Sequence, residues 1–179
     1  MSELDCIEYT KQMQDEDYVV VSINTYGNGE LLTAAPLNCL NKHLLDVLSV
    51  FFDDIEERHI QSGSKNKLCS KEDISNIIEF VEKWRNKVST IIVHCHAGIS
   101  RSSAIASIIS IYLGLDDYWI WSGPYIPNRY IFKLACEFLS LPESTYTKRF
   151  LINDEKHDDD NYLEIEDISP DHLLSIILK

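Results

Sequence analysis

Residues 90–113 read TIIVHCHAGISRSSAIASIISIYL, and this stretch determines the fold that we expect. Its first part, Thr90 to His94, is apolar and mostly β-branched, which is typical of a short buried strand. Its last part, Arg101 to Leu113, is rich in Ile, Ala and Ser and suits a buried helix. Residues 95–100 join the two parts. The stretch therefore predicts a strand, a loop and a helix in direct succession.

Further strands and helices are expected along the rest of the chain. The apolar segment Tyr18 to Asn24 predicts a buried strand, and the end of the run 44–52, from about residue 48, predicts a second one. A helix is expected from Ser70, because Ser70 and Asp73 have the spacing of a capping box, and another over residues 128–139. Strands that alternate with helices indicate an α/β fold with a central, mostly parallel sheet flanked by helices. Ligands of such folds bind at the carboxyl ends of the strands.

The length of 179 residues fits a single domain with one core. We expect this domain to occupy residues 1–150 and an acidic C-terminal extension to occupy residues 151–179. Residues 1–17 are polar and predict either a short helix or an irregular segment. A last short helix is expected to begin at Ser169, because Pro170 follows it and proline suits the first position of a helix.

The composition argues against several classes of partner. The formal net charge is -13 and Lys and Arg form no long run, so we expect no binding to nucleic acid or to an anionic membrane. No apolar run approaches the ~20 residues that cross a bilayer, and the first residues lack the pattern of a secretory signal. The five cysteines are scattered and have no CxxC spacing, which favours a reducing, cytoplasmic location without a structural metal.

The loop at the centre of the stretch has the features of an anion site. It reads HCHAGISRS from His94 to Ser102. Backbone N–H groups in such a loop can point inward, and the N-terminus of the following helix adds positive potential. Arg101 offers a planar fork that matches two phosphate oxygens, and Gly98 allows a backbone angle that other residues resist. The same field favours the thiolate of Cys95, which makes this residue a candidate nucleophile.

This loop resembles the HCxxGxxRS signature of the protein-tyrosine-phosphatase superfamily, and the resemblance covers roughly residues 18–140. It implies a phosphatase fold with a strand, a phosphate loop and a helix, without a cofactor or a metal. It also implies roles for four residues: Cys95 attacks phosphorus, Arg101 holds the phosphoryl oxygens, Ser102 helps the cysteine leave, and His94 helps set the acidity of Cys95. The residues that would line the bound phosphate are His96, Ala97, Gly98, Ile99 and Ser100.

A proton donor for the leaving oxygen is expected upstream of the loop. The segment FFDDI at residues 51–55 places two carboxyl groups just after the predicted second strand. It resembles the acid loop of compact, dual-specificity-like phosphatases of microbial type, and this resemblance favours Asp54 over Asp53. The chain has no WPD sequence, which distinguishes it from the large tyrosine phosphatases. The alternative is that both carboxyl groups cap the strand in solvent.

Asn128 is a further candidate, because a Pro-Asn pair precedes a late helix in many compact members of this superfamily. The resemblance implies that Asn128 braces the phosphate loop, whereas its chemistry alone suits a helix N-cap equally well.

The most consistent interpretation is a phosphatase that hydrolyses phosphotyrosine monoesters in proteins through a cysteinyl-phosphate, with phosphoserine and phosphothreonine left open. An RNA 5'-phosphatase is opposed by the net charge of -13, and a phosphoinositide phosphatase by the lack of lysine within the loop. A phosphopeptide-binding pseudophosphatase is opposed by the presence of Cys95, Arg101 and Ser102. The physiological substrate and the oligomeric state are not determined by the sequence.

Overall fold

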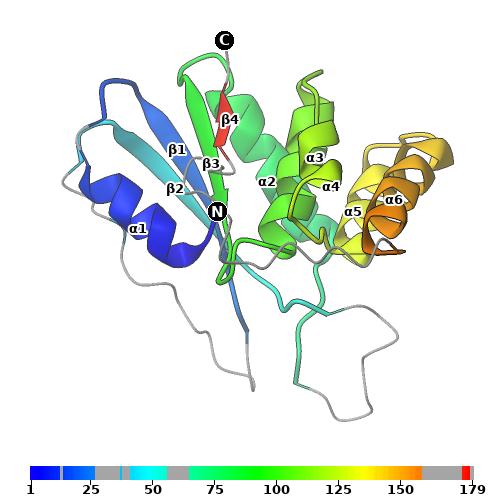
Figure 1. Cartoon of the computed structure of the whole chain (residues 1–179). Coiled ribbons are helices and arrows are strands. Elements are labelled where there is room, and N and C mark those ends of the chain that lie inside the picture. Colours follow the sequence, from blue (N-terminus) through cyan, green and yellow to red (C-terminus); the bar gives the residue numbers. More distant parts are fainter. Residues whose placement is uncertain (13, 27–36, 38–40, 56–64, 159–174, 178–179) are drawn as a thin grey trace.

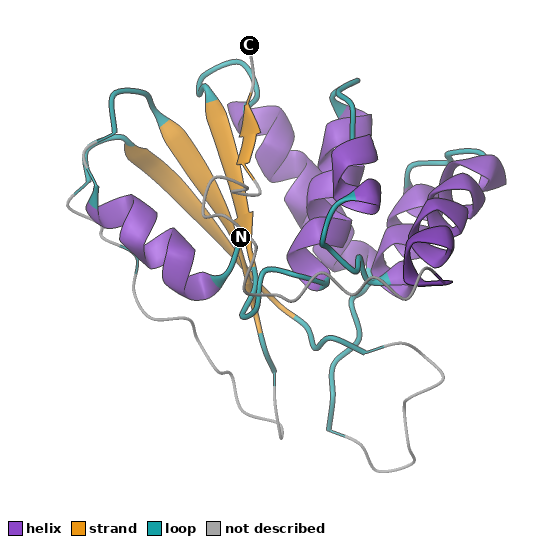
Figure 2. Cartoon of the chain, viewed as in Figure 1, coloured by secondary structure: helices purple, strands orange, loops and turns teal. Residues whose placement is uncertain are grey.

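The computed structural model describes residues 1–12, 14–26, 37, 41–55, 65–158 and 175–177. Its elements follow the expected alternation of strands and helices (Figures 1 and 2). Their bounds, in chain order, are α1 Glu3–Lys11, β1 Tyr18–Asn24, β2 Leu44–Phe51, α2 Lys71–Trp84, β3 Thr90–His94, α3 Arg101–Tyr112, α4 Tyr118–Ser122, α5 Arg129–Phe138, α6 Glu143–Asp158 and β4 Ser175–Ile177.

The sheet has the strand order β2-β1-β3-β4. Strand β1 pairs in parallel with both β2 and β3, so that Val21 lies between Leu48 and Val93. Strand β4 adds an antiparallel edge next to β3. All seven residues of β1 are buried, as expected for the central strand of a parallel sheet. The predicted α/β fold with a mostly parallel sheet is confirmed.

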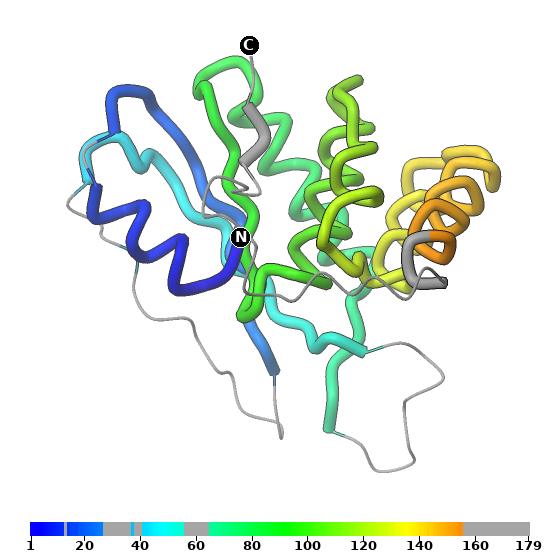
Figure 3. Tube along the Cα trace, viewed as in Figure 1, coloured from blue at the N-terminus to red at the C-terminus, as the bar shows by residue number. Residues whose placement is uncertain are grey.

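Helices cover both faces of this sheet (Figure 1). Helix α1 lies on one face, and α2 and α3 lie on the other. Helices α5 and α6 form an outer layer, in which α5 contacts α2 and α3 while α6 contacts α4 and α5. The trace in Figure 3 shows the N-terminus beside the end of β3, where the chain turns into the loop before α3. No helix in the described ranges combines the length and hydrophobicity that a bilayer crossing requires.

Local sequence chemistry accounts for the helix that begins after Ser70. The Ser70 hydroxyl accepts a hydrogen bond from the Asp73 N–H at 3.2 Å, and an Asp73 carboxylate oxygen accepts one from the Ser70 N–H at 2.9 Å. This reciprocal arrangement confirms the predicted capping box. The apolar side chains at helical spacing are buried, which fixes α2 against the sheet: Ile74, Ile77, Ile78 and Val81.

Four elements differ from the expectation. Strand β2 spans the whole run from Leu44, because even its exposed first half pairs with β1. Helices α4 and α6 and the short strand β4 were not predicted, and α6 continues past residue 150. Arg149 helps to hold this part of α6 in place. Its Nε and Nη2 form a bidentate ion pair with the two carboxylate oxygens of the buried Asp117, each at 2.6 Å. The helix expected from Ser169 lies outside the described residues.

Candidate active site

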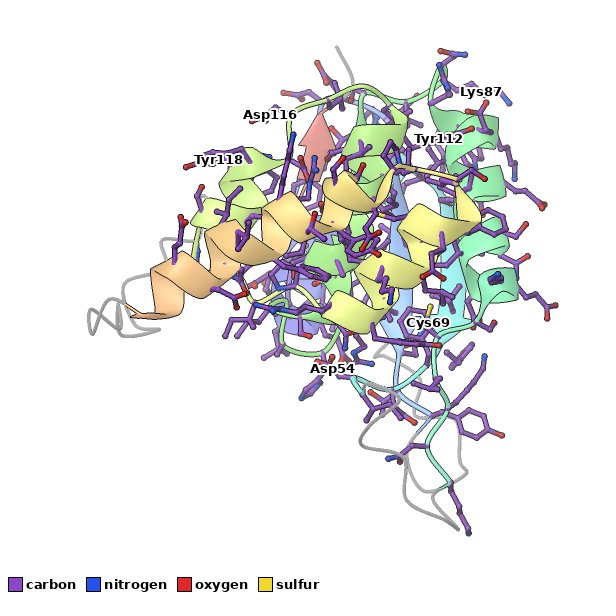
Figure 4. The ribbon with its side chains drawn as sticks, turned by 90° about the vertical axis from the view of Figure 1, so that its right-hand side faces the viewer. Asp54, Cys69, Lys87, Tyr112, Asp116 and Tyr118 are labelled. Atoms are coloured by element: carbon purple, nitrogen blue, oxygen red, sulfur yellow. The ribbon has the colours of Figure 1, made fainter. Side chains whose placement is uncertain are left out.

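The candidate site lies at the carboxyl ends of the three parallel strands. Strand β3 ends at His94, the loop follows, and α3 begins at Arg101. Because β1 and β2 run parallel to β3, Thr25 and the Asp53–Asp54 pair emerge at the same edge. Figure 4 shows Asp54 at this end of the molecule, far from Lys87, Tyr112 and Asp116 at the other end.

Two groups that can donate hydrogen bonds lie next to the sulfur of Cys95. The residue is only 2% exposed, and its Sγ accepts a hydrogen bond from the Gly98 N–H at 3.3 Å. The hydroxyl oxygen of the buried Ser102 lies 3.2 Å from the same sulfur. Donors at these positions favour negative charge on sulfur, both before attack and when the sulfur leaves. The geometry therefore suits the expected roles of Cys95 and Ser102.

Gly98 is required by the path of the loop. Its φ angle of +79° lies in the left-handed region, which favours glycine. A Cβ atom at this position would lie 2.5 Å from the backbone nitrogen of Ser2. Any larger residue would thus displace either the loop or the N-terminal segment.

The backbone of the loop is oriented by contacts with other segments. Because a trans peptide group directs its C=O and the following N–H in opposite directions, a carbonyl that is bonded outside the loop turns the next N–H inward. The N–H groups so oriented belong to Ala97, Ser100 and Arg101. The three carbonyls accept hydrogen bonds at 3.2 Å: His96 O from Glu3 N–H, Ile99 O from Ile126 N–H, and Ser100 O from Asn128 N–H.

Arg101, at the end of the loop, has a buried donor without a partner among the described residues. The residue is 5% exposed, and its Nη1 donates to Phe52 O at 3.0 Å and to Thr25 Oγ1 at 3.1 Å. Its buried Nε has no hydrogen-bond partner among the described residues. An unpaired buried donor of this kind costs about 1–3 kcal/mol, or more when the group is charged. An oxygen of a bound phosphoryl group would relieve this cost.

The two candidate acids have different surroundings. Asp53 is buried, and its two oxygens accept hydrogen bonds from Tyr26 N–H at 2.9 Å and Lys67 N–H at 2.7 Å. Asp54 is exposed, and its Oδ1 accepts from Ser100 Oγ at 2.7 Å and from Asn128 Nδ2 at 2.8 Å. Asp53 thus joins two segments of backbone, whereas Asp54 contacts the phosphate loop.

Asn128 combines the two functions that the sequence left as alternatives. Its side-chain oxygen caps α5 by accepting from Ile131 N–H at 3.0 Å, and its backbone N–H donates to Ser100 O at 3.2 Å. Asn128 is therefore both an N-cap and a brace of the loop.

The two histidines of the motif lie in contrasting environments. His94 is 1% exposed, and its pKa is lowered to about 4, first by burial and then by the nearby N-terminal ammonium group. It is therefore neutral near pH 7 and adds no positive charge to the loop. The side chain of His96 is exposed, and its Nδ1 lies 3.3 Å from a Glu3 carboxylate oxygen.

The sequence did not predict several supports of the site. They are the N-terminal residues, whose Met1 carbonyl accepts a hydrogen bond from Cys95 N–H at 3.3 Å, and the Thr25 and Phe52 oxygens that hold Arg101. Thr25 and Phe52 follow the two neighbouring strands, so strand ends were the available signal. The N-terminal contact has no signal in the sequence. The described residues contain no group of three His, Cys, Asp or Glu side chains that could hold a metal ion.

Residues 55–117 match the family model described as protein-tyrosine phosphatase, and this segment contains β3, the Cys95 loop and α3. This match covers about a third of the chain and supports a relation to the protein-tyrosine-phosphatase superfamily. The chain also aligns with a solved structure described as the crystal structure of Tk-PTP in the active form, over 89% of this chain and 88% of that chain, at 18% identity and a TM-score of 0.38. No curated protein matches it. The matched segment begins after Asp54 and ends before Asn128, so the geometry alone relates these two residues to the site.

Inhibition by iodoacetate and not by EDTA is expected of the phosphatase, because a thiolate rather than a metal-bound water would attack phosphorus. Three of the four other thiols are protected: burial raises the pKa of Cys6 and Cys136 to about 12 and that of Cys69 as well. Cys39 lies outside the described residues. Mass spectrometry of the partly inactivated protein should find carboxymethylation at Cys95 first, and inorganic phosphate should slow it. Loss of activity in EDTA that zinc or magnesium restores would contradict this chemistry.

Proposed function

We propose that this phosphatase hydrolyses phosphotyrosine monoesters in proteins through a cysteinyl-phosphate on Cys95. The observation that carries the proposal is that one loop starts at a buried sulfur, which accepts the Gly98 N–H, and ends at Arg101, whose buried Nε has no partner among the described residues. A compact, dual-specificity-like class of enzyme and a cytoplasmic location are part of the same proposal. They are supported by the Asp-Asp segment after β2 and by the scattered cysteines.

In the first step the Cys95 thiolate forms a bond to phosphorus as the bond to the leaving oxygen breaks. Asp54 gives its proton to that oxygen, so the product leaves as a neutral alcohol. In the second step a water forms the new P–O bond, Asp54 takes a proton from this water, and the S–P bond breaks. The Ser102 hydroxyl stabilises the departing thiolate. Arg101 and the inward N–H groups stabilise the phosphoryl oxygens in both steps.

The proposal is tested by assaying the purified protein on para-nitrophenyl phosphate with and without vanadate, and then on a phosphopeptide panel. We expect vanadate-sensitive hydrolysis and a preference for phosphotyrosine peptides. Turnover of phosphoserine and phosphothreonine peptides at a similar rate would make the enzyme dual-specific. Activity only on a phosphoinositide or on a 5'-triphosphorylated RNA would refute a protein substrate. Tight phosphopeptide binding without turnover would refute catalysis.

The Asp54→Asn variant is expected to lower the turnover of a phosphotyrosine peptide by about 10²–10⁴, the range that a positioned acid contributes. The loss should be smaller for an ester with an acidic leaving phenol, because that group departs without a proton. The basic limb of the pH–rate profile should flatten. Steady-state kinetics on the two substrates across pH measure all three effects.

Asp53→Asn is the matched control for this prediction. In asparagine an NH₂ group replaces one of the two oxygens that accept from Tyr26 N–H and Lys67 N–H, and a donor would then face a donor. The variant should therefore lose stability by about 1–3 kcal/mol. Its dependence on the leaving group should remain that of the wild type. If Asp53→Asn instead shows the larger, leaving-group-dependent loss, then Asp53 is the acid and the assignment of Asp54 is wrong.

A further inference from the structure

Three segments that are distant in sequence meet at the carboxylate of Asp54. Ser100 comes from the phosphate loop, Asn128 precedes α5, and Asp54 itself follows β2. Both hydrogen bonds reach the same oxygen, Oδ1, at 2.7 Å from Ser100 Oγ and 2.8 Å from Asn128 Nδ2. Among the described residues, none donates to Oδ2. The two oxygens of this carboxylate are therefore not equivalent.

The orientation of the Asn128 amide follows from its other contacts. Its oxygen must face the α5 N-terminus, because Ile131 N–H at 3.0 Å requires an acceptor. This leaves the NH₂ group, a donor, facing Asp54. Asn128 is 7% exposed, and its backbone N–H is fixed to Ser100 O, so the amide has little freedom to turn. The side chain thus presents a donor to Asp54 Oδ1 in a fixed direction.

We propose that Asn128 and Ser100 are positioning residues that make Oδ2 the oxygen of Asp54 that carries and delivers the proton. A protonated carboxyl oxygen is a weak acceptor, and a proton on Oδ1 would oppose the two donors already there. The proton therefore resides on Oδ2, and the donors also fix where Oδ2 points relative to the phosphate loop. This inference rests on the proposed role of Asp54 as the acid.

The position of Ser100 couples the acid to the anion site. Its hydroxyl donates to Asp54, while its own N–H lies on the inward side of the loop. A loop that adopts its anion-binding shape thereby places the acid as well. Proton delivery and phosphate binding therefore depend on the same backbone segment, from Ile99 to Arg101.

Asn128→Ser is the main test, because serine is also a strong N-cap and can keep the acceptor for Ile131 N–H, but it is too short to reach Asp54. We expect kcat on a phosphotyrosine peptide to fall about ten- to a hundredfold, as for a lost hydrogen bond to a charged group. The kcat on an ester with an acidic leaving phenol should change little. Ser100→Ala should show the same pattern and provides a second variant should the first fold poorly.

A double-mutant cycle separates positioning from a structural role. In the Asp54→Asn background, Asn128→Ser should cause little further loss, because its effect passes through Asp54. The control Ser70→Ala removes the cap of α2, far from the loop in sequence, and should lower the melting temperature without altering the dependence on the leaving group.

The outcomes distinguish the two proposals. If Asp54→Asn shows a leaving-group-dependent loss and Asn128→Ser and Ser100→Ala do not, the positioning role is refuted while the acid stands. Equal losses on both esters, or an undiminished loss in the Asp54→Asn background, refute it in the same way. If Asp54→Asn shows no such dependence, the acid assignment itself fails, and the positioning role fails with it.

Discussion

The Cys95→Ser variant is expected to lose all measurable turnover and still bind inorganic phosphate or vanadate. A serine hydroxyl has no accessible anion near neutral pH, so it cannot replace the thiolate as nucleophile. The anion site should survive, because Arg101 and the inward N–H groups do not depend on the sulfur. Turnover is measured with a phosphotyrosine peptide at high enzyme concentration, and binding by isothermal titration with vanadate.

A second buried cysteine supplies the control for this variant. Cys69 is 2% exposed, like Cys95, but lies just before the N-cap of α2, and within the described residues its hydrogen bonds join it to Ser70 and Tyr130 and not to the phosphate loop. Cys69→Ser should keep its turnover, whatever its effect on stability. Turnover of Cys95→Ser near the wild-type rate would exclude the covalent mechanism.

The Arg101→Lys variant is expected to lose about 10²–10³ in kcat, the typical effect of removing a donor that stabilises transition-state charge, and to bind phosphate more weakly. A lysine keeps the positive charge but not the planar fork. In Arg101 one nitrogen, Nη1, contacts Phe52 O and Thr25 Oγ1, and a second, Nε, remains for a phosphoryl oxygen. Lysine has a single nitrogen and cannot divide these contacts in the same way. Steady-state kinetics and titration with inorganic phosphate measure the two losses.

Thr25→Val is the matched probe of how Arg101 is held. Valine has the shape of threonine without the Oγ1 acceptor, so the guanidinium group would keep only the contact with Phe52 O. The kcat of Thr25→Val should lie between the kcat of the wild type and that of Arg101→Lys. An Arg101→Lys enzyme with unchanged kcat and unchanged phosphate affinity would show that Arg101 does not contact the phosphoryl group.

The parts of the fold that sequence could predict are those where a local pattern decides the structure. Strands β1 and β3 have the predicted bounds, because compact β-branched runs suit the interior of a parallel sheet. Helix α2 begins where its capping box requires. The strand, loop and helix around Cys95 follow from the same reasoning, since the loop residues carry their anion-binding chemistry in one continuous segment.

The parts that sequence could not predict depend on contacts between distant segments. Helix α6 is mostly polar, and its position depends on contacts with distant residues: Phe150 packs against Trp121 and Phe132, and Arg149 forms an ion pair with Asp117. The convergence of Asn128 and Ser100 on Asp54 joins residues that are 74 and 46 positions from it. Such a contact leaves no periodic pattern in one sequence. The close approach of the Met1 and Ser2 backbone to Gly98 leaves no such pattern either.

The most direct measurement of the central claim is the detection of a phosphoryl group on Cys95 during turnover. The Asp54→Asn enzyme is mixed with an aryl phosphate that has an acidic leaving phenol, stopped within the first turnover, digested and analysed by mass spectrometry. The first step needs no acid with this ester, whereas the second step lacks its base, so the intermediate should accumulate. We predict one phosphoryl group on the peptide that contains Cys95. Release of the phenol without any phosphorylated Cys95, or with the phosphoryl group on another residue, would contradict the account.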